Sequence, residues 1–250
     1  MTFKWGHGII NLMKLEIRER GKTMKLKRVF FDLDGTLTDS REGITKCVQY
    51  ALAKCGIEEP DLKKLECFIG PPLHTSFQKY YGMDRGMAKR AVEFYRERFR
   101  PIGIFENQVY EGVPEMLQAL SEAGCRLAVA SSKPEVFVKK VLDHFDIEKY
   151  FSVVVGSGLD GSREKKEEVV EEALRQLGIL ELSEEERRES CAMIGDREFD
   201  IQGARAWKLT GVGVHYGFAA EGELEAEGAD AIAGTVEELK EILLTGQVKG

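Results

Sequence analysis

Short apolar runs separated by amphipathic segments are the feature that most limits the fold of this chain. Five runs have the length and apolar character of strands that are buried on both faces of a sheet. They are RVFF (28–31), RLAVA (126–130), SVVV (152–155), CAMI (191–194) and GVGV (211–214). Helical patterns lie between most of these runs, at 115–124, 134–145 and 167–178. Strands that alternate with helices predict an α/β fold with a doubly wound, Rossmann-like parallel sheet.

The stretch from residue 41 to residue 107 breaks this alternation. Residues 41–56 and 87–100 have helical periodicity, and no convincing strand pattern lies between them. An insertion of this length after the first strand predicts a small helical subdomain over the end of that strand. We therefore expect an α/β core of residues 24–40 and 108–250, with a helical cap of residues 41–107. Residues 1–23 are expected to be an N-terminal extension outside the fold, because Met24 lies just before the first strand and could itself be the translational start.

Composition excludes several classes of partner. The chain has 250 residues and a formal net charge of −7, so neither nucleic acid nor an anionic membrane is expected to bind the chain as a whole. No apolar run is long enough to span a membrane. The five cysteines are odd in number, widely spaced and without a metal-binding pattern, which is typical of reduced thiols. We expect a cytoplasmic protein, and the sequence does not indicate its oligomeric state.

Polar residues follow three of the predicted strands. Asp32 follows RVFF, Ser131 follows RLAVA, and Asp196 comes one residue after CAMI. The carboxyl ends of parallel strands share one edge of the sheet, where open α/β sheets bind their ligands. Taken alone, Asp34 and Gly35 could simply form a turn. A turn does not explain why three polar residues emerge along the same edge.

Four aspartates would meet at this edge: Asp32, Asp34, Asp196 and Asp200. Carboxylates that lie so close together are unfavourable unless a cation neutralises them. Oxygen ligands without a histidine or a thiolate point to Mg²⁺. The same cation would remove the repulsion between a carboxylate nucleophile and an anionic phosphate.

Four segments resemble, in order and spacing, the sequence motifs of the haloacid dehalogenase superfamily. They are DLDGTLTDS (32–40), VASS (129–132), the lysine in REKKEEVV (163–170) and IGDREFD (194–200). The chain is similar to the phosphoglycolate phosphatase-like branch, which carries a helical cap after the first motif, and the similarity covers residues 24–240. The resemblance implies a Mg²⁺-dependent phosphatase that acts on a small phosphorylated metabolite.

The resemblance also implies roles for single residues. Asp32 would be the nucleophile that becomes an aspartyl-phosphate, and Asp34 would be the general acid and base. Ser131 would donate a hydrogen bond to a phosphoryl oxygen, although a serine at this place could also cap the following helix. A lysine at the start of the helix after the third strand would balance the charge of the phosphoryl group. Lys166 fits that position, with Lys165 as the alternative.

The metal ligands are implied in the same way. Mg²⁺ would bind Asp32, Asp196 and the backbone carbonyl oxygen of Asp34. Asp200 would contribute through water or by holding the ligands, although a negative charge at the start of a helix also favours the helix by itself.

Further substrate contacts are expected from the loops around the first two motifs. Gly35 would let backbone N–H groups approach the phosphoryl oxygens, and Thr36 would steady the loop. Ser132 is expected to bind the substrate beside Ser131. Lys133 is a further candidate for the positive group of the site.

The cap is expected to choose the substrate. The segment Cys67–Phe77 resembles the cap loop that faces the site in this family, and Gly70 with the two prolines after it would keep the loop irregular. His74 could contact the substrate, or it could be an ordinary surface histidine. Three arginines could bind a carboxylate or a second phosphate of the substrate: Arg41, Arg98 and Arg100.

The leading hypothesis is a phosphomonoesterase whose substrate is phosphoglycolate or a nucleoside 5′-monophosphate. A sugar phosphomutase would share the core and would differ by keeping the phosphoryl group from water. A dehalogenase would need neither the metal nor the second aspartate. A catalytically silent binding module is the alternative outside the enzymes, but such a module has no need for a nucleophile and an acid.

Overall fold

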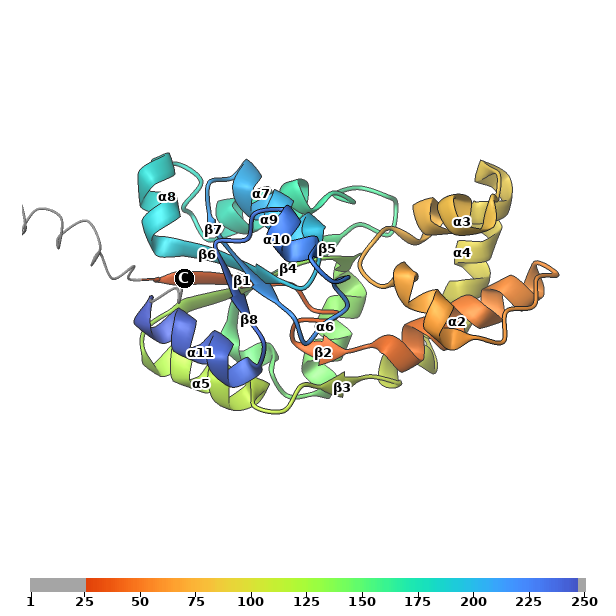
Figure 1. Cartoon of the computed structure of the whole chain (residues 1–250), viewed down its shortest axis with the longest axis horizontal. Coiled ribbons are helices and arrows are strands. Elements are labelled where there is room, and N and C mark those ends of the chain that lie inside the picture. Colours follow the sequence, from red (N-terminus) through yellow and green to blue (C-terminus); the bar gives the residue numbers. More distant parts are fainter. Residues whose placement is uncertain (1–25, 247–250) are drawn as a thin grey trace, which may run out of the picture.

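A six-stranded parallel sheet forms the centre of the molecule (Figure 1). The computed structural model describes residues 26–246, so the predicted extension of residues 1–23 lies outside the described residues. The strands are β1 (Arg28–Phe31), β4 (Arg126–Pro134), β5 (Phe151–Ser157), β6 (Cys191–Gly195), β7 (Thr210–Val214) and β8 (Ala231–Ala233). Their order across the sheet is β5-β4-β1-β6-β7-β8. The chain thus builds outwards from β1 on one side and then on the other, which confirms the predicted doubly wound fold.

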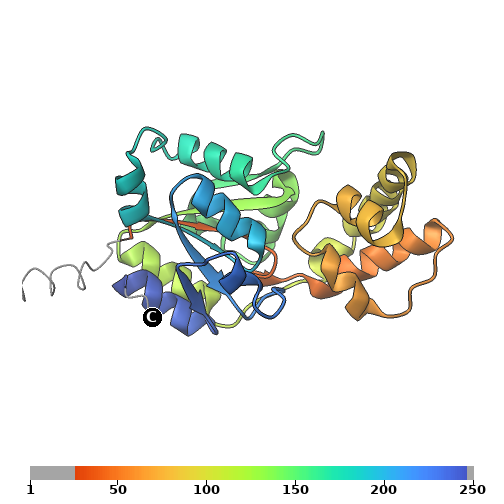
Figure 2. The same cartoon turned by 45° about the horizontal axis from the view of Figure 1, so that its top comes forward.

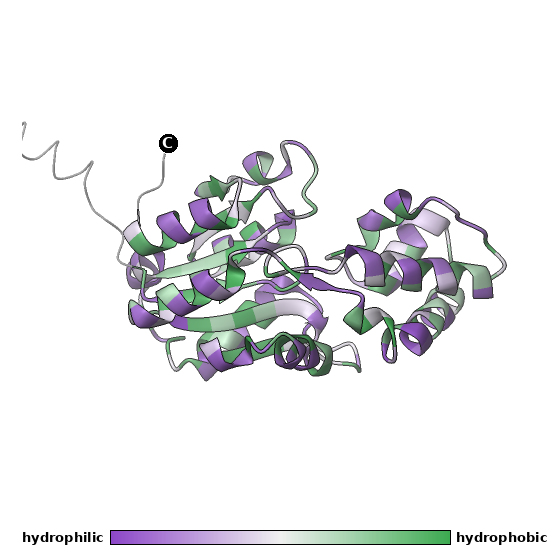
Figure 3. Cartoon of the chain, turned by 90° about the horizontal axis from the view of Figure 1, so that it is seen from below, coloured by the Kyte–Doolittle hydropathy of each residue, from purple (hydrophilic) through white to green (hydrophobic). Residues whose placement is uncertain are grey.

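Helices cover both faces of this sheet. One face carries α5 (Val113–Glu122), α6 (Glu135–His144) and α11 (Val236–Thr245); the other carries α7 (Lys166–Gln176) and α9 (Glu198–Ala206). Two shorter helices complete this part of the chain: α8 (Glu184–Ser190) and α10 (Glu223–Ala226). Because side chains alternate along a strand, Val29 and Phe31 of β1 pack on the α5 side and Phe30 packs on the α7 side. Hydrophobic residues run along the strands and the helix sides that face them (Figure 3).

A second group of helices lies beyond the carboxyl end of β1, apart from the sheet (Figures 1 and 2). It consists of α2 (Arg41–Lys54), α3 (Leu73–Tyr81), α4 (Arg85–Phe99) and the 3₁₀ turns η1 (Leu62–Phe68) and η2 (Gly103–Phe105). Aromatic pairs support it, with ring centroids 4.9 Å apart for Phe68 and Phe77 and 5.2 Å apart for Tyr95 and Phe99. We propose that these helices are the cap.

Two short strands connect this helical group to the sheet. β2 (Thr38–Asp39) leaves the core and β3 (Gln108–Val109) returns to it. They pair antiparallel, with Thr38 opposite Val109 and Asp39 opposite Gln108. The chain therefore crosses between the two parts at a single paired site.

Three local features differ from the sequence-based expectations. The segment predicted as an irregular loop, Cys67–Phe77, becomes helical from Leu73, because Pro72 has a φ of −58° that is compatible with a helix start. Strand β4 continues past Ala130 to Pro134, although its register becomes irregular after Ala130. Strand β8 was not expected, since three residues are too short for a periodic signal. No helix in the described part of the chain has the length and apolar character needed to cross a membrane.

Candidate active site

The carboxyl ends of β1 and β6 bring two of the predicted aspartates together. Asp32 directly follows β1, and its backbone N–H donates to the carbonyl oxygen of Ile194 in β6 at 2.9 Å. Asp196 follows β6, and Asp200 lies in the first turn of α9. All three carboxylates are buried, and they offer oxygen atoms that lie within 4.8 Å of one another. Three of the four carboxylates expected to meet at this edge of the sheet lie together, and the Asp34 side chain is not one of them.

Lys166 neutralises part of this charge. It is the first residue of α7, and its ammonium group lies 3.0 Å from Asp32 Oδ1 and 2.8 Å from Asp200 Oδ1. The same group donates to the carbonyl oxygen of Ala130 at 3.1 Å. Burial lowers the pKa of Lys166, but the attraction of Asp200 and Asp32 outweighs burial, so the pKa lies above its ordinary value and the side chain stays charged. Lys165 is exposed and lies just before the helix, so Lys166 occupies the site.

The charges of this group do not balance. Burial, followed by the neighbouring charges of Asp200 and Asp32, raises the pKa of Asp196 well above its usual range. Burial also raises the pKa of Asp200 to about 6, against the opposing effect of Lys166. We call Asp32, Asp196, Asp200 and Lys166 the carboxylate cluster: three acidic groups with one ammonium group, which contacts Asp32 and Asp200.

The donor set of the carboxylate cluster fits a hard divalent cation. All available ligand atoms are carboxylate oxygens, and a buried excess of negative charge is stabilised by a cation. Asp34 lies outside the group of three, and its side chain contacts Lys133 instead. The metal role expected for Asp34 concerned its backbone carbonyl oxygen, so this side-chain position does not contradict that expectation.

Lys133 is a site residue that the sequence suggested only as one candidate among three lysines. Its ammonium group lies 2.8 Å from both carboxylate oxygens of Asp34. The same group lies 5.0 Å from the centre of the Phe99 ring, so it also contacts α4 of the proposed cap. The backbone N–H of Lys133 donates to Ser131 Oγ at 3.3 Å, and Ser131 is buried. Both residues come from the irregular end of β4.

The loop after β1 packs directly on Asp196. Gly35 has a φ of +81°, and a Cβ at this position would lie 2.1 Å from Asp196 Oδ2. Thr36 Oγ1 donates to Asp196 Oδ1 at 3.4 Å, and the backbone N–H of Phe218 donates to Asp196 Oδ2 at 2.8 Å. A Cβ at Gly217 would come within 2.3 Å of Asp196 Cβ. The loop that contains Gly217 gave no sequence signal, because it follows β7 without a motif.

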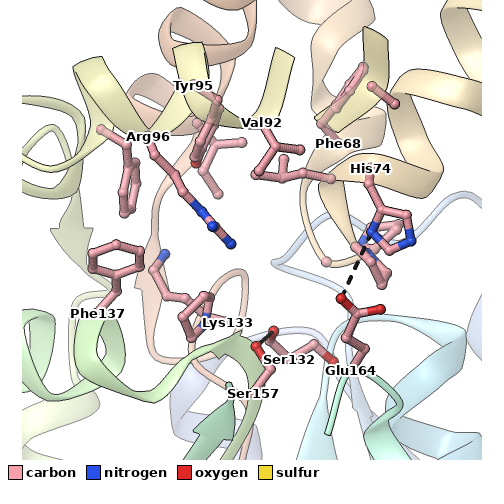
Figure 4. A pocket seen from close by; sticks show the side chains of 18 of the residues that line it. Phe68, His74, Val92, Tyr95, Arg96, Ser132, Lys133, Phe137, Ser157 and Glu164 are labelled. Carbon is pink, nitrogen blue, oxygen red and sulfur yellow. Dashed lines mark hydrogen bonds and ion pairs between the residues drawn. The ribbon is translucent and has the colours of Figure 1, made fainter. Parts of the chain in front are cut away.

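A cavity of about 400 Å³ lies between the sheet edge and the helical group (Figure 4). We call it the cap cavity. Of the predicted substrate contacts, Ser132, Gly70 and His74 line it, whereas Gly35 and Thr36 do not. Asp34 and Lys133 also line it, and the other lining residues include several aromatic side chains: Phe68, Tyr95, Phe99 and Phe137. The cap cavity therefore opens onto the proposed acid and base of the site.

None of the three arginines suggested from the sequence lines the cap cavity. Arg98 forms an ion pair with Glu106 at 2.7 Å, and Arg41 lies 3.4 Å from Glu66. Arg96, which lies on the other side of α4 from Arg98, lines the cavity instead. The choice among these arginines depends on how α4 is rotated, which the helical periodicity alone did not reveal.

Arg197 joins the core to the cap loop. Its guanidinium group donates to the carbonyl oxygen of Ile69 at 2.7 Å and to Glu223 at 2.8 Å. Gly70 has a φ of +100°, and a Cβ there would lie 3.2 Å from Arg197 Cγ. A weaker contact joins His74 to Glu164, at 3.9 Å, across the cap cavity (Figure 4).

A family model for haloacid dehalogenase-like hydrolases matches residues 29–214, which include the four motifs and the whole carboxylate cluster. The chain belongs to this family. A 5′-nucleotidase from Pseudomonas aeruginosa is 45% identical over 224 residues, covering 90% of this chain and 98% of the relative. A tyrosine-protein kinase, PtkA, from Mycobacterium tuberculosis is 36% identical over 217 residues, covering 86% of this chain and 72% of the relative.

Solved structures agree with the family match. The crystal structure of a predicted phosphatase from Clostridium acetobutylicum superposes with a TM-score of 0.83 at 45% identity, covering 88% of this chain and 99% of that chain. This haloacid dehalogenase-like chain is an enzyme of the phosphatase-type hydrolases, which confirms the class expected from its motifs.

Proposed function

We propose that this haloacid dehalogenase-like enzyme is a Mg²⁺-dependent phosphatase that hydrolyses nucleoside 5′-monophosphates or similar small phosphate monoesters. The observation that carries the proposal is the carboxylate cluster, in which three buried carboxylates lie together at the carboxyl edge of the sheet and two of them contact one ammonium group. Such a cluster supplies a nucleophile, a fixed positive group and oxygen ligands within one small volume.

Asp32 is the proposed nucleophile. Lys166 contacts its Oδ1 atom, which holds the carboxylate in place and leaves the second oxygen for attack on phosphorus. The new bond from Asp32 to phosphorus forms as the ester bond to the leaving oxygen breaks, and the product is an aspartyl-phosphate. The Ser131 hydroxyl is proposed to donate to a phosphoryl oxygen during this step. A Mg²⁺ ion held by Asp32, Asp196 and the backbone of Asp34 would neutralise charge between the carboxylates and the phosphoryl group.

Asp34 is the proposed general acid and base. It gives a proton to the leaving oxygen in the first step, and it later takes a proton from the water that attacks the aspartyl-phosphate. The second step releases inorganic phosphate and restores the Asp32 carboxylate. Lys133 contacts both oxygens of Asp34 and therefore orients the group towards the cap cavity.

The cap cavity favours a nucleotide over phosphoglycolate. Its aromatic lining by Phe68, Tyr95, Phe99 and Phe137 suits a flat ring, and its volume of about 400 Å³ is more than a two-carbon acid needs. The name of the Pseudomonas aeruginosa relative, a 5′-nucleotidase, supports the same choice.

A panel of phosphate monoesters tests the proposal. The purified enzyme is assayed with nucleoside 5′-monophosphates, phosphoglycolate, a hexose phosphate, a tyrosine phosphate peptide and p-nitrophenyl phosphate. Assays are run with EDTA and again after Mg²⁺ is added back. We expect release of inorganic phosphate that EDTA abolishes and Mg²⁺ restores, with nucleotides as the best metabolite substrates. Full activity in EDTA, or isomerisation of the hexose phosphate without phosphate release, would contradict the proposal.

A further inference from the structure

Arg96 projects from α4 into the cap cavity. Figure 4 shows its guanidinium group extending from the helix towards Ser132, between Tyr95 and Val92 on the cap side and Lys133 on the core side. The side chain is half-buried. Within residues 26–246, Arg96 makes no hydrogen bond or ion pair, whereas Arg98 on the same helix is paired with Glu106. Arg96 is therefore a partly desolvated cation whose donors are free in the absence of substrate.

The surroundings of Arg96 disfavour the charged form of its side chain. Partial burial and then the positive charge of Arg100 lower the pKa of Arg96, and Glu164, which also lines the cap cavity, opposes this effect. Of the other cations that line the cavity, Lys133 is already engaged with Asp34, and Arg85 and Lys89 are exposed. A guanidinium group has five donors and no acceptor, so an acceptor on the substrate would satisfy the donors of Arg96.

The position of Arg96 separates it from the reacting phosphoryl group. Asp32, Ser131, Lys166 and Asp196 do not line the cap cavity, whereas Arg96 does. Asp34, the proposed general acid, does line the cavity. The leaving oxygen of the substrate would therefore lie beside Asp34. A substrate held between Asp34 and Arg96 therefore presents its non-reacting part to Arg96.

We propose that Arg96 is a specificity residue that binds an oxygen acceptor on the non-reacting part of the substrate. This proposal rests on the proposed phosphatase function and names the chemistry that the cap selects. The acceptor is a carbonyl oxygen of a nucleobase, or it is a carboxylate; in guanine a guanidinium group can bind the carbonyl oxygen together with a ring nitrogen. The aromatic residues beside Arg96 favour the nucleobase.

Arg96→Ala is compared with Arg90→Ala in the full-length enzyme. Arg90 is a matched control, because it lies on the same helix, is exposed and does not line the cap cavity. Each variant is assayed with GMP, UMP, AMP, phosphoglycolate and phenyl phosphate, whose non-reacting part carries no acceptor for Arg96. For the best metabolite substrate, we expect Arg96→Ala to raise KM by about tenfold or more with kcat within about threefold. The kcat/KM for phenyl phosphate should stay within about threefold, and Arg90→Ala should resemble the wild type.

The substrate preferences of the wild type and of Arg96→Ala identify the group that binds Arg96. A wild-type preference for GMP and UMP over AMP that disappears in Arg96→Ala assigns the nucleobase carbonyl. A preference for phosphoglycolate that disappears in the same variant assigns a carboxylate. Arg96→Lys should restore much of the affinity for a carboxylate, because an ammonium group keeps the ionic attraction. It should restore little of the affinity for GMP, whose neutral base depends on the two parallel hydrogen bonds that a guanidinium group forms.

Three outcomes would overturn the inference. Equal losses on phenyl phosphate would show that Arg96 acts on the phosphoryl group. Unchanged KM values for every substrate, in an active enzyme, would leave Arg96 without a role in specificity while the proposed function stands. A wild-type enzyme that hydrolyses no ester in the presence of Mg²⁺ would overturn both proposals.

Discussion

The carboxylate cluster and the cap cavity are built in opposite ways. In the carboxylate cluster the side chains are buried, and Lys166 contacts two of the three carboxylates at about hydrogen-bond distance. In the cap cavity the walls are mostly apolar, and Arg96 has no partner among the described residues. Lys166 in the cluster is already paired before substrate binds, whereas Arg96 in the cavity would gain its hydrogen-bond partner from the substrate. We therefore propose that the sheet edge carries out the chemistry and that the helices select the substrate.

The largest effect is expected from a substitution in the carboxylate cluster. Asp32→Asn removes the proposed nucleophile, so we expect kcat with p-nitrophenyl phosphate and Mg²⁺ to fall by about 10⁴-fold. The fold should remain intact, because neutralising one of three close carboxylates reduces their repulsion. Thermal unfolding and circular dichroism check the fold. Asp143→Asn, an exposed aspartate on α6, is the control, and activity of Asp32→Asn within tenfold of the wild type would refute the nucleophile assignment.

The next prediction concerns the tight packing around the cluster. Gly35→Ala places a methyl group about where Asp196 Oδ2 lies, so Asp196 or the loop after β1 must shift. We expect kcat/KM to fall by about 100-fold, because a displacement of this size misplaces the reacting groups. Gly56→Ala is the matched control, since Gly56 has a φ of +80° and open space around its missing Cβ. If both variants lose activity equally, backbone strain and not the contact with Asp196 is the cause.

Stability in the absence of metal gives a sharper test of the excess negative charge. Burial raises the pKa of Asp196 above its unfolded value, and it raises that of Asp200 to about 6. A carboxyl group whose pKa is raised on folding stabilises the protein below the unfolded pKa, and this contribution is lost as the pH rises through the folded pKa. In EDTA, the free energy of unfolding should therefore decrease between about pH 4 and pH 7, by an amount on the order of 2 kcal/mol.

The variant Asp196→Asn isolates one part of this pH effect. It should unfold at a higher temperature than the wild type at pH 7 in EDTA, and the difference should shrink towards pH 4. Added Mg²⁺ should stabilise the wild type and leave Asp196→Asn nearly unchanged. Equal stabilisation of both proteins by Mg²⁺ would place the cation elsewhere. Differential scanning calorimetry over this pH range supplies the measurement.

The smallest effect is expected on the cavity side. His74 lines the cap cavity, but its side chain is largely exposed and its contact with Glu164 spans 3.9 Å. Such a contact contributes little, so His74→Ala should change KM for the best substrate by less than about threefold. Steady-state kinetics of His74→Ala and Arg96→Ala, measured side by side, compare the two residues directly. A KM increase for His74→Ala as large as that for Arg96→Ala would make the histidine a main substrate contact.

The sheet edge could be predicted from the sequence because its geometry follows from chain order. Alternating strands and helices determine a parallel sheet, and residues directly after its strands must share one edge. Asp32 and Asp196 therefore lie together where the sequence placed them, an inference that needed only spacing and element type. The sequence favoured Lys166 over Lys165 only through the family resemblance, and the start of α7 at Lys166 decides between them in the structure.

The cap side could not be predicted in the same way. Which arginine of α4 enters the cavity depends on the rotation of the helix and on the aromatic packing around Phe68 and Tyr95. The contact between Lys133 and Asp34 depends on the irregular end of β4, which periodicity does not describe. Gly217 reaches Asp196 from a loop that follows β7, so only the tertiary structure brings the two together. Long-range packing, and not local propensity, decides each of these contacts.

The paired strands β2 and β3 have a consequence for how this molecule can change. Because Thr38 lies opposite Val109 and Asp39 opposite Gln108, the polypeptide departs and comes back through neighbouring positions. Any foreign segment whose two ends meet at the usual spacing of paired strands could be spliced in there without disturbing the sheet. The proposed cap could thus be replaced while the carboxylate cluster is kept. The junction at β2 and β3 is therefore the place at which new substrate preferences could evolve or be engineered.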